Sequence, residues 1–192
     1  LINNEKVLGN DIYPLIGVIE RNDAKQLTKK LVAFSPLQVL NKNYDENLSE
    51  GDAVRLFSLD QIRGLENNKL LHKISMEGTK NRNIEDPVLR AFLSERAVFV
   101  RGAVRQAGAY PVVDGTTLES IIAVAGGLAL EANSENIELT SRSAGRQVIN
   151  FTAANPENIS VGAGDTIRVN QKFHKIADQS VMLVGEVNHP GR

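Results

Sequence analysis

The sequence predicts an α+β protein in which one small unit, a mixed β-sheet packed on a short helix, is used more than once. Two internal sequence similarities indicate the repeat. Residues 98–108 align with residues 181–191 at an offset of 83, and residues 50–56 align with residues 163–169 at an offset of 113. Serial units of this kind more often scaffold or bind than catalyse. We therefore expect a piece of a longer repeat protein with a structural or binding role.

The second unit, residues 96–171, is predicted to be complete and to open with a hairpin of two strands. Apolar and β-branched residues alternate over residues 97–104, as they do in a strand. Residues 105–108 then turn the chain, and residues 109–113 return as the partner strand. Gly102 and Gly108 are the glycines expected to shape this turn.

A helix is predicted over residues 116–125, after a second turn. Thr116 and Glu119 have the spacing of a capping box, in which each side chain binds a backbone N–H of the other residue. Gly126 and Gly127 should end the helix, because glycine adopts the left-handed C-terminal turn at little cost. The apolar residues at helical spacing, all expected to be buried, are Leu118, Ile121, Ile122 and Ala125.

Three further strands complete the second unit. Residues 136–140 and 147–151 alternate around a short turn at Ala144-Gly145, and residues 166–169 follow the turn pair Gly164-Asp165. The order strand, strand, helix, strand, strand, strand is that of a β-grasp, a mixed sheet that clasps one helix. An unrelated small α+β domain is the alternative that the pattern leaves open.

The first unit, residues 1–58, is predicted to be the back half of the same fold. In the preferred register Glu20 aligns with Ser141 at an offset of 121, so about eight residues are missing from the second copy, most naturally opposite residues 41–47. A rival register sets Gly17 on Gly102, but the helix with its Gly-Gly end does not follow. The half unit should present an unpaired sheet edge and an open core face.

Residues 59–95 are expected to form a linker of helices and a polar loop. A short helix should begin near residues 58–63, and the Gly-, Lys- and Asn-rich residues 77–83 read as the loop. Asp86 and Pro87 have the residue types of an N-cap and a first helical turn. The side chains expected to be buried by this second helix are Val88, Ala91 and Phe92, with Leu89 as a further candidate.

The composition excludes several classes of function. With a net charge of −1 and a pI near 6.4, the 192-residue chain has no electrostatic basis for binding nucleic acid. The absence of cysteine excludes disulfides and thiol catalysis. Aromatic residues are scarce, with no Trp and only three Tyr and six Phe, so there is little material for the stacking platforms that grip sugars tightly.

No motif supports catalysis, a metal site or a cofactor. His72, His174 and His189 lack any ligand spacing. Asp52 and Asp165 follow glycines at strand entrances, where a turn bond between side chain and backbone explains them. We therefore predict a protein that is not an enzyme and that uses no cofactor.

Four arginines are the candidate binding residues. Arg55 and Arg168 recur at equivalent repeat positions, and Arg101 and Arg105 flank the first hairpin. As binding residues they would contact an acidic polymer or a carboxylate of a neighbouring subunit. As ordinary surface residues they would be solvated charges, which is the alternative.

The ordered motifs resemble the SLBB (soluble-ligand-binding β-grasp) domain of outer-membrane polysaccharide export proteins from Gram-negative bacteria. The resemblance rests on residues 98–111, Thr117-Leu118, residues 125–128 and residues 164–169, with residues 184–191 similar to the opening of a further copy. Ala107 stands where the family commonly has Pro before the hairpin Gly. The family's export-signature and membrane-spanning regions have no counterpart in these residues.

The resemblance implies a periplasmic protein attached to the outer membrane through other parts of the protein. It implies that the full-length protein assembles into a homo-oligomeric ring that exports capsular polysaccharide or exopolysaccharide, with an inner-membrane export partner. The alternative is a soluble periplasmic module that binds one small ligand. Scarce aromatics favour the first function, because a conduit needs weak contacts along which a polymer can slide.

Residues 180–192 are predicted to start a further module. Their apolar strand, residues 181–187, should add to a sheet of this chain or of a neighbouring copy, because unpaired strands bond readily to open edges. The half unit at residues 1–58 is the expected acceptor.

Overall fold

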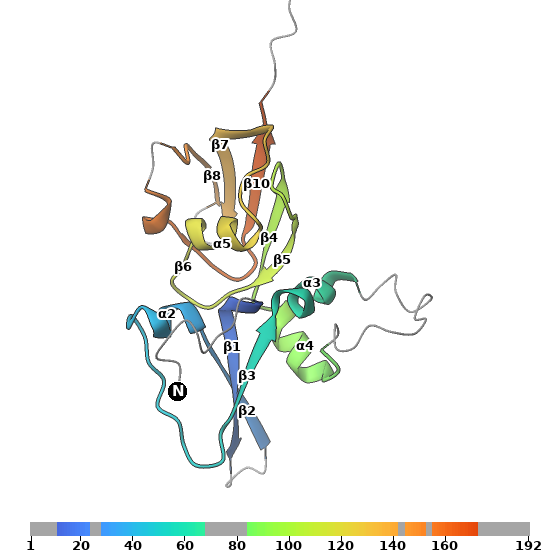
Figure 1. The fold of residues 1–192 in the computed structure, drawn as a ribbon, viewed down its shortest axis with the longest axis vertical. Helices are drawn as coiled ribbons and strands as arrows, with labels where there is room; N and C mark the ends of the chain where they lie inside the picture. The colour runs from blue at the N-terminus through green and yellow to red at the C-terminus, as the bar shows by residue number, and fades with distance from the viewer. Residues whose placement is uncertain (1–10, 24–27, 68–83, 142–144, 153–154, 173–192) are drawn as a thin grey trace, which may run out of the picture.

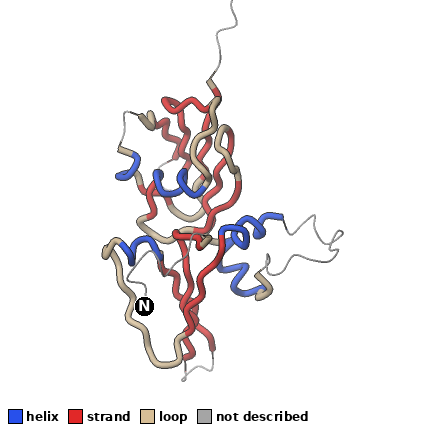
Figure 2. Tube along the Cα trace, viewed as in Figure 1, coloured by secondary structure: helices blue, strands red, loops and turns tan. Residues whose placement is uncertain are grey.

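Two sheets are arranged one after the other along the long axis of the molecule (Figure 1). The structure, a computed structural model, describes residues 11–23, 28–67, 84–141, 145–152 and 155–172. A five-stranded sheet with helix α5 forms one half, and a three-stranded sheet with helices α2, α3 and α4 forms the other. Both halves combine strands with short helices (Figure 2). The fold is mixed α+β, as the sequence predicts.

The five-stranded sheet has the order β5-β4-β10-β7-β8. The central strand β10 is parallel to β4, and every other neighbouring pair is antiparallel. A short ladder of β6 and β9 lies beside it, and a 3-10 turn, η2, precedes β9. The bounds are β4 Ala97–Gly102, β5 Gly108–Pro111, β6 Thr116–Thr117, β7 Ala132–Ser141, β8 Gly145–Ile149, η2 Pro156–Asn158, β9 Ser160–Val161 and β10 Thr166–Gln171.

Helix α5 (Leu118–Val124) covers one face of this sheet, which confirms the β-grasp arrangement. All four apolar side chains predicted for the helix are buried, at 3% exposure or less. The predicted capping box of Thr116 and Glu119 does not form, and the helix starts one residue later with a simple N-cap. The N-cap is Thr117, whose hydroxyl accepts from the Ser120 N–H at 3.2 Å, because Thr116 belongs to β6 and its hydroxyl donates to the Val113 carbonyl.

The three-stranded sheet has the order β2-β1-β3, with both pairs antiparallel. Its strands are β1 (Ile12–Asp23), β2 (Thr28–Phe34) and β3 (Ala53–Ser58), with helix α2 (Pro36–Leu40) between β2 and β3. β1 is antiparallel to both of its neighbours, and so is β7 in the five-stranded sheet. β4, in contrast, is parallel to one neighbour, β10, so β1 corresponds to β7 and not to β4. The rival register, which sets Gly17 on Gly102, is therefore wrong.

The two sheets share a register shift at matching positions. Along β1 and β3 the pairs step from Ile12–Ser58 to Gly17–Leu56, and along β7 and β10 they step from Ala132–Gln171 to Ile137–Val169. Five residues on one strand thus face two on the other in both ladders. This pairing aligns Glu20 with Thr140, an offset of 120 in place of the predicted 121.

The length difference between the two sheets is seven residues, and it does not lie where the sequence alignment put it. Phe34 pairs with Gly17 as Ile149 pairs with Ile137, which gives β2 and β8 an offset of 115. Five of the seven residues therefore belong to the β1–β2 hairpin. Only two belong to the connection that contains residues 41–47, because sequence anchors alone could not divide the gap between the two loops.

The strand entrances of β3 and β10 have the same turn. The Asp52 carboxylate accepts from the Ser49 N–H at 2.8 Å, and the Asp165 carboxylate accepts from the Gly162 N–H at 2.9 Å. The glycines before these aspartates, Gly51 and Gly164, both have a φ of +85°. Both aspartates therefore make a turn bond between side chain and backbone, as predicted, but to a residue three positions earlier and not to one two positions ahead as in an Asx turn.

Helices α3 (Leu59–Asn67) and α4 (Pro87–Ser94) pack near β1, β3 and β5. Asp86 caps α4 as predicted, accepting from the Val88 and Leu89 N–H groups. The predicted buried face is partly wrong: Leu89 is buried as expected, but Val88 is 66% exposed and Ala91 is also exposed. Leu93, which was not predicted, is buried. Leu89 and Leu93 are four residues apart and so share one face of the helix, with Phe92 half-buried beside them.

One hydrophobic cluster joins the two halves of the molecule. It contains Leu15 and Val18 of β1, Ile62 of α3, and Ile137 and Ile167 of the five-stranded sheet. At the junction the Tyr13 hydroxyl donates to the Pro111 carbonyl at 2.9 Å, and the Tyr13 ring stacks on Tyr110 with 6.5 Å between centroids. The described residues therefore share a continuous core.

Candidate binding face of the five-stranded sheet

The face of the five-stranded sheet opposite α5 is polar and open to solvent. Side chains alternate along each strand, so Val100, Ile137 and Ile167 point toward the helix and are fully buried. Their neighbours Arg101 and Arg168 point to the other side and are exposed. We call this second side the arginine face.

Register pairing brings two arginines together at the centre of the arginine face. Arg101 of β4 pairs with Arg168 of β10, and Arg168 pairs with Glu138 of β7. In the described part of the chain, neither guanidinium has a carboxylate within ion-pairing distance. Like charges on adjacent strands repel each other, so an anion that bridges the two guanidinium groups would be favoured here.

Glu138 is already engaged at the edge of this pair. Its carboxylate accepts from the Asn170 amide at 3.1 Å and from the Arg146 guanidinium at 2.6 Å. These two hydrogen bonds, with the nearby charges of Arg146 and Arg168, lower the pKa of Glu138 below its ordinary value. Together the side chains of Arg101, Arg168, Arg146 and Glu138 carry a net positive charge on this part of the described face.

Aromatic and apolar side chains are sparse on the arginine face. The Arg101 guanidinium lies 5.9 Å from the centroid of the half-buried Phe99 ring, and Val148 is 61% exposed. A sugar polymer would therefore meet charges and hydrogen-bonding groups with few stacking surfaces, which favours weak contacts over tight ones.

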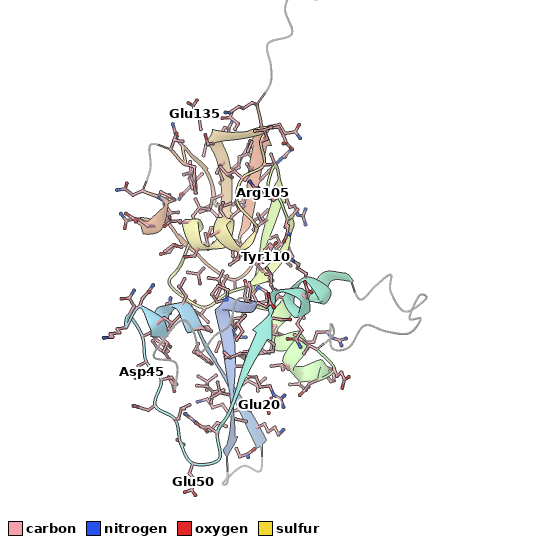
Figure 3. All side chains as sticks on the ribbon, viewed as in Figure 1. Glu20, Asp45, Glu50, Arg105, Tyr110 and Glu135 are labelled. Atoms are coloured by element: carbon pink, nitrogen blue, oxygen red, sulfur yellow. The ribbon has the colours of Figure 1, made fainter. Side chains whose placement is uncertain are left out.

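The four arginines singled out from the sequence do not form one cluster. The structure brings only Arg101 and Arg168 together. Arg55 lies on β3 in the other sheet, where it donates to the Glu20 carboxylate, which Lys29 also approaches at 3.6 Å. Figure 3 shows Arg105 and Glu20 in different halves of the molecule.

Arg105 belongs to a second polar site. Its backbone N–H donates to the Gly127 carbonyl at 3.1 Å, which places it beside the end of α5. With Arg63, Gln106 and Tyr110 it lines a cavity of about 400 Å³. Within the described residues, the buried Arg63 Nε has no hydrogen-bond partner.

Sequence reasoning missed Arg146 and Arg63. Arg146 could have been found from strand alternation, because Thr140 pairs with Arg146 and places it on the same side as Glu138. No sequence pattern could have identified Arg63, since its site forms only when α3 packs against β5.

The residues predicted to shape turns have different roles. Gly102, Gly126, Gly127 and Gly164 all have left-handed backbone conformations, as turn residues do. Gly108 is instead the first residue of β5, where it pairs with Val100. Asp165 is buried at the entrance of β10 and makes the turn bond described above.

Other candidate chemistry finds little support in the part of the chain that the structure describes. Those residues contain no group of three or more His, Asp or Glu side chains that could hold a metal ion. None of the described helices is both long and apolar enough to cross a membrane. His72, His174, His189 and the predicted strand 181–187 lie outside the described residues.

Residues 97–152 match the family model of the SLBB domain, and this range contains β4, β5, α5, β7 and β8. No curated protein matches the chain.

Proposed function

We propose that this chain is a periplasmic part of an outer-membrane protein that exports capsular polysaccharide or exopolysaccharide, because residues 97–152 match the SLBB domain, a ligand-binding β-grasp. In this function the arginine face contacts the polymer. The full-length protein assembles into a homo-oligomeric ring, attached to the outer membrane through other parts of the protein, and meets an inner-membrane export partner.

The observation that carries the proposal is the adjacency of Arg101 and Arg168. Among the described residues neither guanidinium forms a close ion pair, because Glu138, which lies opposite Arg168, is bound by Arg146 and Asn170. Bacterial capsular polymers that carry carboxylates or phosphates would supply the missing anions at intervals. Exposed guanidinium groups bind such anions through contacts that are screened by salt and break readily. Contacts of this strength suit a polymer that must move past the site.

Titration calorimetry with acidic and neutral oligosaccharides of equal length tests the proposal. We expect weak binding of the acidic oligosaccharide that disappears at high salt, with no binding of the neutral one. Arg101→Gln and Arg168→Gln should each weaken binding severalfold, whereas Lys30→Gln, an exposed charge on the other sheet, should not. Equal affinity for both oligosaccharides, or no effect of either arginine variant, would contradict the proposal.

The cavity lined by Arg63 and Arg105 favours a second function, a module that binds one small anionic ligand. Its Arg63 Nε is buried without a partner among the described residues, and its volume of about 400 Å³ suits a small molecule. Sub-micromolar affinity for one small anion, lost in Arg105→Gln but kept in Arg101→Gln, would replace the export function with this one.

A further inference from the structure

The three-stranded sheet carries an apolar groove on one face. The groove has a volume of about 610 Å³ and is lined by Ile19, Phe34 and Val54 of the sheet and by residues of α2 and the following loop. Three of its large hydrophobic side chains are substantially exposed, Val54 at 37%, Tyr44 at 39% and Leu48 at 42%. Exposed apolar side chains gathered in one place mark an interaction site.

The matching face of the five-stranded sheet is covered. The shared pairing aligns Ile19 with Leu139 and Val54 with Ile167. Leu139 and Ile167 are buried in the core beneath α5, at 4% and 0% exposure. The groove therefore lies on the face of the three-stranded sheet that corresponds to the face covered by α5 in the five-stranded sheet.

The sheet edge beside the groove also matches a paired edge. Residues 166–169 of β10 pair in parallel with residues 99–102 of β4. At the aligned positions of β3, Ala53, Val54 and Arg55 are exposed, and β3 is an edge strand among the described residues. An exposed edge is a template for a further strand.

We propose that residues 181–187 of a second copy of this chain fill that edge as a parallel strand and cover part of the groove. Residues 181–191 align with residues 98–108, which include most of β4, at an offset of 83. Pairing like that of β4 with β10 would set Val54 opposite Leu183 and Leu56 opposite Gly185. Leu183 would take the place that the fully buried Val100 has in the five-stranded sheet, facing the groove.

A second copy is favoured over the same chain by the arrangement of the molecule. Among the described residues, β10 ends near one extreme of the long axis, and the exposed start of β3 lies toward the other (Figure 1). The contact would join different surfaces of two copies, so it would repeat from copy to copy and form either a ring or an open filament. It concerns the assembly part of the proposed function, and its failure would leave the polymer contact of the arginine face unaffected.

Engineered cysteines in the full chain test this pairing, because the natural sequence has no cysteine. Directly paired strand residues lie about 4.8 Å apart, within the span of a disulfide. An equimolar mixture of Val54→Cys and Leu183→Cys chains should form a disulfide-linked heterodimer on mild oxidation. The double variant should form linear multimers or closed rings in a non-reducing gel.

Two controls separate the proposal from its alternatives. Arg55→Cys mixed with Leu183→Cys should crosslink at least tenfold less, because adjacent positions on β3 point to opposite sides. Deleting residues 178–192 should convert a concentration-dependent oligomer into a monomer in light scattering. A disulfide confined to single chains, no preference for position 54 over 55, or unchanged association after the deletion would each overturn the proposal.

Discussion

Gly102 ends β4 at a position that only glycine tolerates. Its φ is +86°, and a Cβ atom there would lie 2.1 Å from the Val169 carbonyl oxygen of the adjacent strand. Two separate penalties would therefore follow from any side chain, one from the left-handed backbone and one from the steric clash. The residue stabilises the parallel β4–β10 contact by its lack of a side chain.

Replacing Gly102 and Gly127 by alanine should separate these two penalties. Gly127 has a similar φ of +87°, but a Cβ atom there would meet nothing within 4 Å among the described residues, so Gly127→Ala should cost about 1–2 kcal/mol from the backbone alone. Gly102→Ala should lower the free energy of unfolding by clearly more than that. Urea denaturation measures both, and equal losses would show that the clash relaxes freely.

Asp52 makes the stability of the three-stranded sheet depend on pH. Its carboxylate accepts from the Arg21 Nη2 at 2.8 Å and from the Ser49 N–H. These hydrogen bonds, that of Arg21 foremost, lower the pKa of Asp52 below its ordinary value. The stabilisation is therefore present above about pH 4, the unfolded pKa, and is lost as the pH falls through the lower folded pKa.

Asp52→Asn should remove this pH dependence while keeping an acceptor for the Ser49 N–H. We expect the variant to be less stable than the natural protein at pH 7, and the difference to shrink as the pH is lowered below about 4. Urea midpoints at several pH values measure it, with Arg21→Gln as the matched variant on the other side of the pair. A difference that stays constant with pH would contradict the prediction.

Among the elements, α5 shows most clearly how pattern becomes structure. Its apolar residues recur at the helical period and are all buried, so its existence and its buried face could be predicted from sequence. Its start could not, because Thr116 and Thr117 are both suitable caps and the pairing of Thr116 with Val161 decides between them. In α4 the same reasoning succeeded for Leu89 and failed for Val88, since adjacent apolar residues do not define one face.

The burial of α5 makes Ile122 a strong test of the β-grasp. Ile122 is 3% exposed, so Ile122→Ala should cost about 2–5 kcal/mol through lost burial and a residual cavity. Val148→Ala, at a 61% exposed strand position, should stay within about 0.5 kcal/mol. Thermal or urea unfolding measures both, and a loss under about 0.5 kcal/mol for Ile122→Ala would show that the helix does not form the core.

At the scale of the whole molecule, Tyr13 ties the two sheets together. Its hydroxyl is buried and donates to the Pro111 carbonyl, so Tyr13→Phe would leave that carbonyl without its partner at a cost of about 1–3 kcal/mol. Because one hydrophobic cluster spans both sheets, the variant should unfold in a single transition at lower denaturant. Circular dichroism measured against denaturant concentration follows this unfolding transition. Two separated transitions would show that the halves unfold independently.

The arrangement of the halves explains why the candidate site was only partly predictable. Repeat alignment correctly identified Arg55 and Arg168 as occupying equivalent strand positions. It could not show that Arg55 is bound by Glu20 while Arg168 meets Arg101, because these partners come from strand registers of two different sheets. The cavity beside Arg105 likewise could not be predicted from the sequence, since Arg63 contributes to it from helix α3.

The matching register shift indicates that the two sheets of this chain arose by duplication of one segment. Both sheets have the same register shift, five residues against two, and the same Gly-Asp turn, while their hairpins differ in length by five residues. Hairpin tips accept insertions, whereas a one-residue slip within a ladder would turn its apolar side chains outward. Distant relatives should therefore be sought by the spacing of the register shift and the Gly-Asp turn as well as by residue identity.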